Sequence, residues 1–203
     1  MIYDITRPVT MTLPVWPGDT PFSVNHLLRK SEGQSVNLTT LHTTAHLGTH
    51  ADAYYHYADD GAFIGAMPLS AYIGPAQVVT VTKRDGPLFP ADIGVLAGVE
   101  RLLIHSHVSH LDEVWPDIFP YLSVELIDWF AGQGGRLIGL DSPSVDAFDS
   151  QNLPCHHALR RNGMVNLETL YLRDVPDGDY ELVALPLKLD NACGSPVRAI
   201  LRD

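Results

Sequence analysis

The sequence His46-Leu47-Gly48-Thr49-His50-Ala51-Asp52-Ala53-Tyr54-Tyr55-His56 concentrates metal-binding and acid–base side chains in one short stretch. Imidazole and carboxylate groups together suit a borderline divalent cation such as zinc. On an extended strand, residues four apart would lie about 13 Å from each other, too far to share one ion. We therefore expect His46 and His50 on one helical turn or a tight curve, with Gly48-Thr49 favouring a bend. Asp52 would follow as the chain leaves that turn, and the stretch predicts hydrolytic metal chemistry.

His56 lies four residues beyond Asp52. We expect it to line the same cavity without necessarily binding metal. A lone histidine is more often an ordinary core or surface residue than a ligand, but this spacing of three histidines and an aspartate favours a site.

Size and charge limit the class of protein. A chain of 203 residues suits one domain or at most two small ones, and we expect a single domain that spans 1–203. With 45% apolar residues, the chain can form a core. A formal net charge of −11 disfavours binding to nucleic acid or anionic lipid. The chain has no apolar run long enough for a transmembrane helix and no signal peptide at its start, so we expect a cytoplasmic protein with no membrane partner. Cys155 and Cys193 do not form a disulfide framework.

Glycine and proline separate many short elements along the chain. Runs of Val, Ile and Leu predict strands at 36–41, 76–82, 101–104, 136–140, 180–187 and 197–201. Capping residues predict helices at 123–131 and 154–162, where Ser123 and Pro154 begin them and Gly132 and Gly163 end them. This order indicates a single mixed-sheet α/β domain, with a barrel-like or layered sheet and a few packed helices.

A second set of candidate ligands lies more than a hundred residues downstream. His156 falls at the start of the second predicted helix, and Glu168 on the extended segment after it. His157 is the alternative to His156 as the metal ligand. If His156 is not a ligand, we expect it to cap the helix or pack against its neighbours. Spacing alone favours a solvated charge for Glu168. With His46, His50 and Asp52 these residues make five ligands, which is more than one tetrahedral ion can bind. Five ligands suit a pair of ions about 3.5–4 Å apart.

Three further histidines, His105, His107 and His110, follow another predicted strand. Their spacing suits a metal site, but the sequence offers no carboxylate close by. We expect surface histidines at a strand end, with no assigned role.

Several segments, in the same order over nearly the whole chain, resemble one family. The marker His-x-Gly-Thr/Ala-His-x-Asp-Ala-Pro-x-His of the cyclase-type metal-dependent hydrolases matches the stretch from His46 to His56, except that Tyr54 replaces the proline. The other matching segments are 15–21 (VWPGDTP), 139–146 (GLDSPSVD), 156–168, and 179–187.

The resemblance implies a swivelling β/β/α (cyclase-like) fold, usually as a homodimer, with two divalent metal ions per subunit. Zinc is the usual metal, and manganese or cobalt are possible. By this resemblance the first ion is held by His46, His50 and Asp52, and the second by Asp52, His156 and Glu168. It also makes His56 the proton donor and acceptor, and Trp16 the contact to the substrate's aromatic ring.

The segments around Trp16 and Asp146 narrow the resemblance to members that hydrolyse N-formyl-L-kynurenine, an aryl formamide, to L-kynurenine and formate. The implied reaction uses a water activated by the two metals. One alternative is a related enzyme that opens a lactam such as isatin, and another is a non-catalytic metal-binding module. A hydrolase using Ser144 or Cys155 is disfavoured because no nucleophile motif surrounds them. Tyr54 leaves substrate choice open, since it either loosens the His56 loop or forms a pocket wall.

Overall fold

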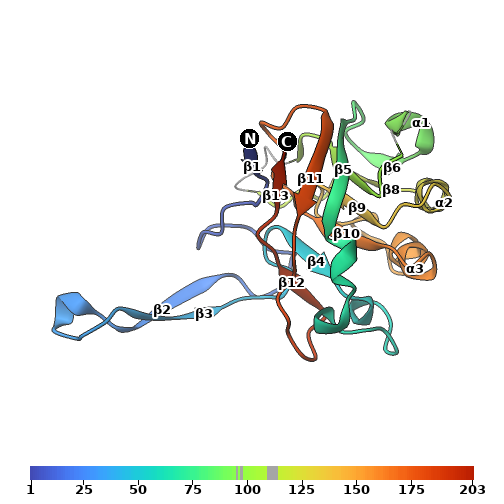
Figure 1. Cartoon of the computed structure of the whole chain (residues 1–203). Helices are drawn as coiled ribbons and strands as arrows, with labels where there is room; N and C mark the ends of the chain where they lie inside the picture. Colours follow the sequence, from blue (N-terminus) through green and yellow to red (C-terminus); the bar gives the residue numbers. More distant parts are fainter. Residues whose placement is uncertain (95, 97, 109–113) are drawn as a thin grey trace.

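The computed structural model describes all residues except 95, 97 and 109–113. In the part of the chain that it describes, a nine-stranded mixed sheet organises the molecule (Figure 1). The strands, in order across the sheet, are β1 (Ile2–Asp4), β13 (Ile200–Arg202), β11 (Gly178–Val183), β5 (Ile73–Thr80), β7 (Arg101–His105), β9 (Leu137–Leu140), β10 (Val165–Glu168), β4 (His50–Asp52) and β12 (Gly194–Pro196).

The centre of the sheet is parallel, and its flanks are antiparallel. Strands β5, β7, β9 and β10 pair in parallel, while β4 and β12 on one side and β11, β13 and β1 on the other pair antiparallel. Every residue of β7 and β9 is buried. This burial explains their continuous apolar sequences, because parallel strands are covered on both faces.

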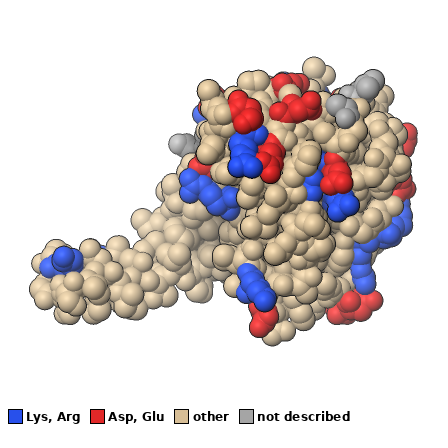
Figure 2. Space-filling view, in the orientation of Figure 1, with Lys and Arg blue, Asp and Glu red and all other residues tan. Residues whose placement is uncertain are grey.

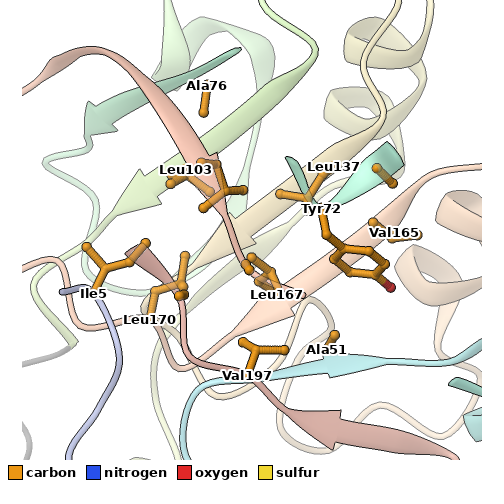
Figure 3. Packing of buried hydrophobic residues seen from close by; sticks show 14 of the residues in the cluster. Ile5, Ala51, Tyr72, Ala76, Leu103, Leu137, Val165, Leu167, Leu170 and Val197 are labelled. Carbon is orange, nitrogen blue, oxygen red and sulfur yellow. The ribbon is translucent and has the colours of Figure 1, made fainter. Parts of the chain in front are cut away.

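Side chains along a strand point alternately to the two faces of the sheet, so the sheet separates two hydrophobic cores. On β7, Leu102 and Ile104 join the core beneath the helices, whereas Leu103 joins the core on the opposite face. Figure 3 shows the second core, where Leu103, Leu137 and Leu167 pack together.

The helices α1 (Pro90–Ile93), α2 (Val124–Ala131) and α3 (Pro154–Arg161) lie on one side of the sheet (Figure 1). Ser123 begins α2 as predicted, since its Oγ accepts a hydrogen bond from the Leu126 N–H at 3.0 Å. Pro154 occupies the first turn of α3. The two long helices therefore match their predicted ranges to within one residue at each end.

A long hairpin leaves the body of the molecule (Figures 1 and 2). It consists of β2 (Ser23–Leu28) and β3 (Leu38–His42), with the short 3-10 helix η1 (Lys30–Glu32) at its tip. Leu27, Leu38 and Leu41 are exposed on it. An isolated two-stranded hairpin with exposed apolar side chains is marginal in water, and this arm lacks the packing that stabilises the nine-stranded sheet.

The remaining elements are short. Strands β6 (Gly86–Leu88) and β8 (Pro120–Leu122) form a parallel pair beside the helices. The 3-10 helices η2 (Tyr54–His56), η3 (Ile64–Ala66) and η4 (Leu69–Ala71) connect β4 to β5. Among the described residues, no helix has the length and apolar character needed to cross a membrane.

The predicted mixed α/β fold is confirmed by this arrangement. The expected strands at 76–82, 101–104 and 136–140 correspond to β5, β7 and β9, which lie side by side. The closing strands are also confirmed in part, because β11 and β13 pair antiparallel with Leu182 opposite Leu201. The predicted strand at 180–187 starts two residues late and extends beyond the end of β11 at Val183.

Candidate metal centre

The first three candidate ligands meet where the chain enters β4. His46 precedes the strand, and Gly48, with φ 55°, turns the chain between His46 and His50. The bend is therefore the correct alternative, and the helical turn is wrong. His50 and Asp52 are two residues apart on β4 and so face the same side of it. Asp52 Oδ1 lies 2.9 Å from His46 Nδ1 and 3.4 Å from His50 Nε2.

The second candidate pair approaches the same carboxylate from the other side. His156 stands in the first turn of α3, and Glu168 ends β10, where it pairs directly with His50 of β4. His156 Nε2 lies 3.4 Å from Asp52 Oδ2 and 3.7 Å from Glu168 Oε1. His50 Nε2 lies 3.4 Å from Glu168 Oε2. The five side chains thus form two groups of three that share Asp52, each with ligand atoms within 4.8 Å of one another.

The two adjacent histidines of α3 have different surroundings. His156 is buried against the carboxylates, whereas His157 is exposed and its ring lies 5.6 Å from the Tyr57 ring. The geometry brings His156 to the centre and leaves His157 outside it.

Neighbouring groups fix the orientation of these side chains. His156 Nδ1 donates to Asp146 Oδ2 at 2.7 Å, and His50 Nδ1 donates to the Gly48 carbonyl at 2.7 Å. In both rings the other nitrogen, Nε2, faces the shared carboxylates. Asn166 Nδ2 donates to Asp52 Oδ2 at 2.7 Å and to Glu168 Oε1 at 3.1 Å. Such supporting hydrogen bonds are typical of metal ligands.

The charges at the centre are strongly coupled. Burial alone lowers the pKa of a histidine, but at His50 the hydrogen bonds and charges of Asp52 and Glu168 outweigh it and raise the pKa to about 10. The same balance of burial and carboxylates raises the pKa of His156 to about 10 and that of His46 to about 9. Despite burial, hydrogen bonds from the three histidines hold the pKa of Asp52 well below its usual range. The carboxylates thus favour protonated histidines in the metal-free protein, and a cation would replace the protons on the nitrogens that face it.

This donor set fits divalent metal ions. Neutral imidazole and carboxylate are zinc ligands, and a carboxylate with its two oxygens facing two different groups suits a bridge between ions. Most of the donor groups are shielded from bulk water, since both carboxylates, His50 and His156 are buried.

His56 and Cys193 stand next to this centre. His56, the last residue of η2, is exposed, and its ring lies 4.2 Å from the His46 ring and 6.0 Å from the His156 ring. Cys193 Sγ lies 3.2 Å from His46 Nε2. Hydrogen bonds from His46 and His56 lower the pKa of the Cys193 thiol to about 6. No spacing in the sequence points to this contact, because Cys193 lies 147 residues after His46.

A cavity of ≈ 380 Å³ opens over the centre and is lined in part by His46, His56 and Glu168. Trp16 forms another part of its wall, with its ring 5.1 Å from the Phe148 ring and 5.7 Å from the Trp115 ring. Cavities of this size, with aromatic walls and a few polar groups, hold small organic ligands.

Comparison with known proteins identifies the family. Residues 3–147 match the family model described as "Putative cyclase". The chain belongs to the cyclase family.

Curated members of the cyclase family resemble this chain over almost its full length. It is 42% identical to a kynurenine formamidase of Bacillus cytotoxicus and 40% identical to one of Bacillus cereus, with 98% of this chain and 96% of each relative covered. A solved structure, isatin hydrolase A from Labrenzia aggregata, matches with a TM-score of 0.85 at 23% identity, covering 99% of this chain and 93% of that one. A predicted metal-dependent hydrolase from Bacillus stearothermophilus matches with a TM-score of 0.81 at 25% identity, covering 99% and 97%. These neighbours confirm the cyclase-like fold.

Tyr54, which replaces the proline of the cyclase marker, has a structural position. Its hydroxyl donates to the Met164 carbonyl at 3.0 Å, and its ring packs against the core. It begins η2, which carries His56. Tyr54 therefore anchors the His56 loop and is not among the described residues that line the cavity.

The expectation of surface histidines after β7 is wrong for His105. This residue is buried, and its Nε2 lies 4.0 Å from Asp141 Oδ2, a carboxylate that is distant in sequence. His107 is half-buried, and its ring lies 4.3 Å from that of His105. His110 lies outside the described residues.

Asp146 and Asn166 are the supporting residues that sequence reasoning missed. Both lie inside segments that carried the family resemblance, which was the available signal. Their roles depend on which side chains α3, β4 and β10 bring together, and no spacing in the sequence gives that.

Proposed function

We propose that the chain is a metal-dependent arylformamidase that hydrolyses N-formyl-L-kynurenine to L-kynurenine and formate. The observation that carries this proposal is the meeting of His46, His50, Asp52, His156 and Glu168 at the base of an aromatic-walled cavity, with His56 beside them. The curated relatives named kynurenine formamidase support the substrate.

The proposed cofactor is a pair of zinc ions, one held by His46, His50 and Asp52 and the other by Asp52, His156 and Glu168. Supporting this count, the two groups share one carboxylate whose two oxygens face different histidines. When bound, such ions lower the pKa of a water to near 7 and polarise a carbonyl oxygen.

His56 is proposed as the proton donor and acceptor. An imidazole can both accept and donate a proton, and the exposure of His56 leaves its ring accessible to water. An amide is cleaved readily only if its departing nitrogen is protonated. His56 supplies that proton to the arylamine as the bond to the formyl carbon breaks, having accepted one from the attacking water.

Trp16 is proposed to bind the aromatic ring of the substrate. Its indole lines the cavity and is held by Phe148 and Trp115, so it offers a fixed aromatic surface. A ring stacked there holds the formamide over the metal centre, which lowers the entropic cost of reaching the transition state.

We further propose a homodimer. The hairpin of β2 and β3 extends away from the sheet with Leu27, Leu38 and Leu41 exposed, and its charged residues, Arg29, Lys30 and Glu32, lie in or next to the 3-10 helix at its tip. Figure 2 shows most of this arm without Lys, Arg, Asp or Glu. Packing against a second copy would remove this apolar surface from water. We also propose that residues 1–203 form one domain, since the central sheet takes strands from both ends of the chain. The two cysteines are unpaired, which supports a reduced, cytoplasmic location.

The test combines metal analysis with an assay on three substrates. Protein purified without chelator should contain about two zinc ions per chain by elemental analysis and hydrolyse N-formyl-L-kynurenine. Isatin should be a much poorer substrate. Preferential hydrolysis of isatin would assign a lactam hydrolase instead, and a metal-loaded chain inactive on both and on formanilide would favour a binding module.

A further inference from the structure

A tight turn at the cavity wall brings Trp16 together with a carboxylate. The Asp19 N–H donates to the Trp16 carbonyl at 2.9 Å, Pro17 follows Trp16, and Gly18 has φ 91°. These features define a type II turn, in which the third residue must adopt positive φ. The α-carbons of Trp16 and Asp19 therefore lie within about 7 Å of each other.

Both ends of this turn line the cavity over the metal centre. Trp16 contributes an aromatic surface and Asp19 a negative charge. Because the turn holds the two α-carbons within about 7 Å, the indole and the carboxylate reach neighbouring parts of the cavity, and a ligand that carries both a ring and a cation can contact them together.

The lining of the cavity makes Asp19 distinctive. Among the described lining residues, Asp19 and Glu168 are the carboxylates and none is lysine or arginine. Glu168 belongs to the metal centre, so Asp19 is the carboxylate left for a ligand. Its Oδ1 accepts a hydrogen bond from the Thr20 N–H at 2.6 Å, the one donor to it within the described ranges. A carboxylate has about four lone-pair sites, so Asp19 can accept further hydrogen bonds.

We propose that Asp19 is a specificity-determining residue that binds the α-ammonium group of the substrate. This inference rests on the proposed function, because N-formyl-L-kynurenine carries an aryl ketone and an α-amino acid on one short chain. Trp16 contacts the aromatic ring of the substrate, and Asp19 binds its ammonium group. A neutral lactam such as isatin has the ring but lacks the ammonium, so Asp19 favours the amino-acid formamide over it. Charge-assisted hydrogen bonds of this kind are stronger than neutral ones.

The experiment compares Asp19→Asn with the wild type on two substrates. One is N-formyl-L-kynurenine, and the other is its analogue with hydrogen in place of the α-amino group. Asparagine keeps the size of the side chain and an oxygen for the Thr20 N–H but removes the charge. We expect KM for N-formyl-L-kynurenine to rise about 10- to 100-fold with little change in kcat. Both constants for the analogue should stay within about twofold, and the metal content should be unchanged.

Asp179→Asn is the matched control, because Asp179 is exposed on β11 and does not line the cavity. An equal loss on both substrates would make Asp19 a structural residue of the turn. No loss on either substrate would also overturn the proposal.

A binding measurement separates this inference from the proposed function. Calorimetric titration with L-kynurenine and with its des-amino analogue needs no hydrolysis. The wild type should bind L-kynurenine more tightly, and Asp19→Asn should remove that difference. If the wild type cleaves no formamide but shows this binding pattern, the proposed reaction fails and the ammonium site stands. Equal binding of both ligands by the wild type would refute the site.

Discussion

His156 donates a hydrogen bond from Nδ1 to Asp146 Oδ2 at 2.7 Å, so its other nitrogen, Nε2, faces the cluster of carboxylates. Asp146 also accepts hydrogen bonds from the backbone N–H groups of Cys155 and His156, at 2.9 and 3.1 Å. Together these bonds tie the first turn of α3 to the Asp146 loop. They fix the position of a candidate metal ligand and keep the remaining proton on Nδ1 when a cation takes the place of the proton on Nε2.

Replacing Asp146 should therefore weaken metal binding although Asp146 is not itself a ligand. We expect Asp146→Asn to lower the affinity for the second ion about 10- to 100-fold, the range typical of such supporting residues. Competition with a fluorescent zinc chelator measures this directly. Asp149→Asn is a suitable control, because Asp149 lies nearby and takes no part in the hydrogen bonds to His156. Equal zinc affinity in Asp146→Asn and the wild type would remove Asp146 from the site.

The adjacent histidines of α3 provide a second test. His156→Ala should lower the metal content from two ions toward one per chain, because Asp52 and Glu168 alone hold the second ion weakly. His157→Ala should keep both ions, since that side chain is exposed on the outer face of the helix. Elemental analysis after gel filtration distinguishes the two variants. Loss of metal from His157→Ala alone would reverse the assignment.

The part of this site that sequence reasoning could predict is the part encoded locally. The bend between His46 and His50 was predictable from Gly48-Thr49. Strand β4, whose period of two places His50 and Asp52 on one side, was not predicted. The helix that carries His156 was also predictable, because Pro154 stands in its first turn and Gly163 lies just past its end.

What the sequence could not show is how distant segments meet. Glu168 lies opposite His50 because β10 and β4 pair in a particular register, and spacing alone favoured a solvated charge for it. The same limitation explains His105, which the sequence left at a strand end without a partner. The parallel pairing of β7 and β9 places that strand end beside Asp141.

Removal of the His56 imidazole should affect turnover more than metal binding. We expect His56→Ala to retain both ions and to lose about 10²- to 10⁴-fold in kcat on N-formyl-L-kynurenine, the usual contribution of a general acid–base group. Steady-state kinetics and elemental analysis on the same preparation test both parts. An unchanged kcat would exclude His56 from proton transfer.

Trp16 should contribute to binding and orientation. We expect Trp16→Ala to raise KM by about tenfold or more with unchanged metal content, because the indole and its contacts to Phe148 and Trp115 are lost. Trp16→Phe, which keeps an aromatic face, should restore most of the affinity. If both variants show the wild-type KM, Trp16 is a packing residue of the wall.

The raised histidine pKa values predict an unusual dependence of stability on pH in the metal-free protein. The pKa values of His50 and His156 are about 10 in the folded chain, against about 6.5 for unfolded histidine. Their stabilising contribution is therefore complete below about pH 6.5 and is lost as the pH rises toward 10. The pKa of Asp52 is lowered, so its contribution is lost as the pH falls below the ordinary range of aspartate.

Chelator-treated protein should consequently unfold in urea at progressively lower concentration between pH 6.5 and pH 10. With zinc in excess the trend should reverse from pH 6 to pH 8, because the ions compete with protons for the same nitrogens and stabilise only the folded state. Calorimetry in buffers of different ionisation enthalpy should show protons released as zinc binds. Urea midpoints that rise with pH without metal, or zinc binding without proton release, would contradict a centre whose histidines hold protons until a cation displaces them.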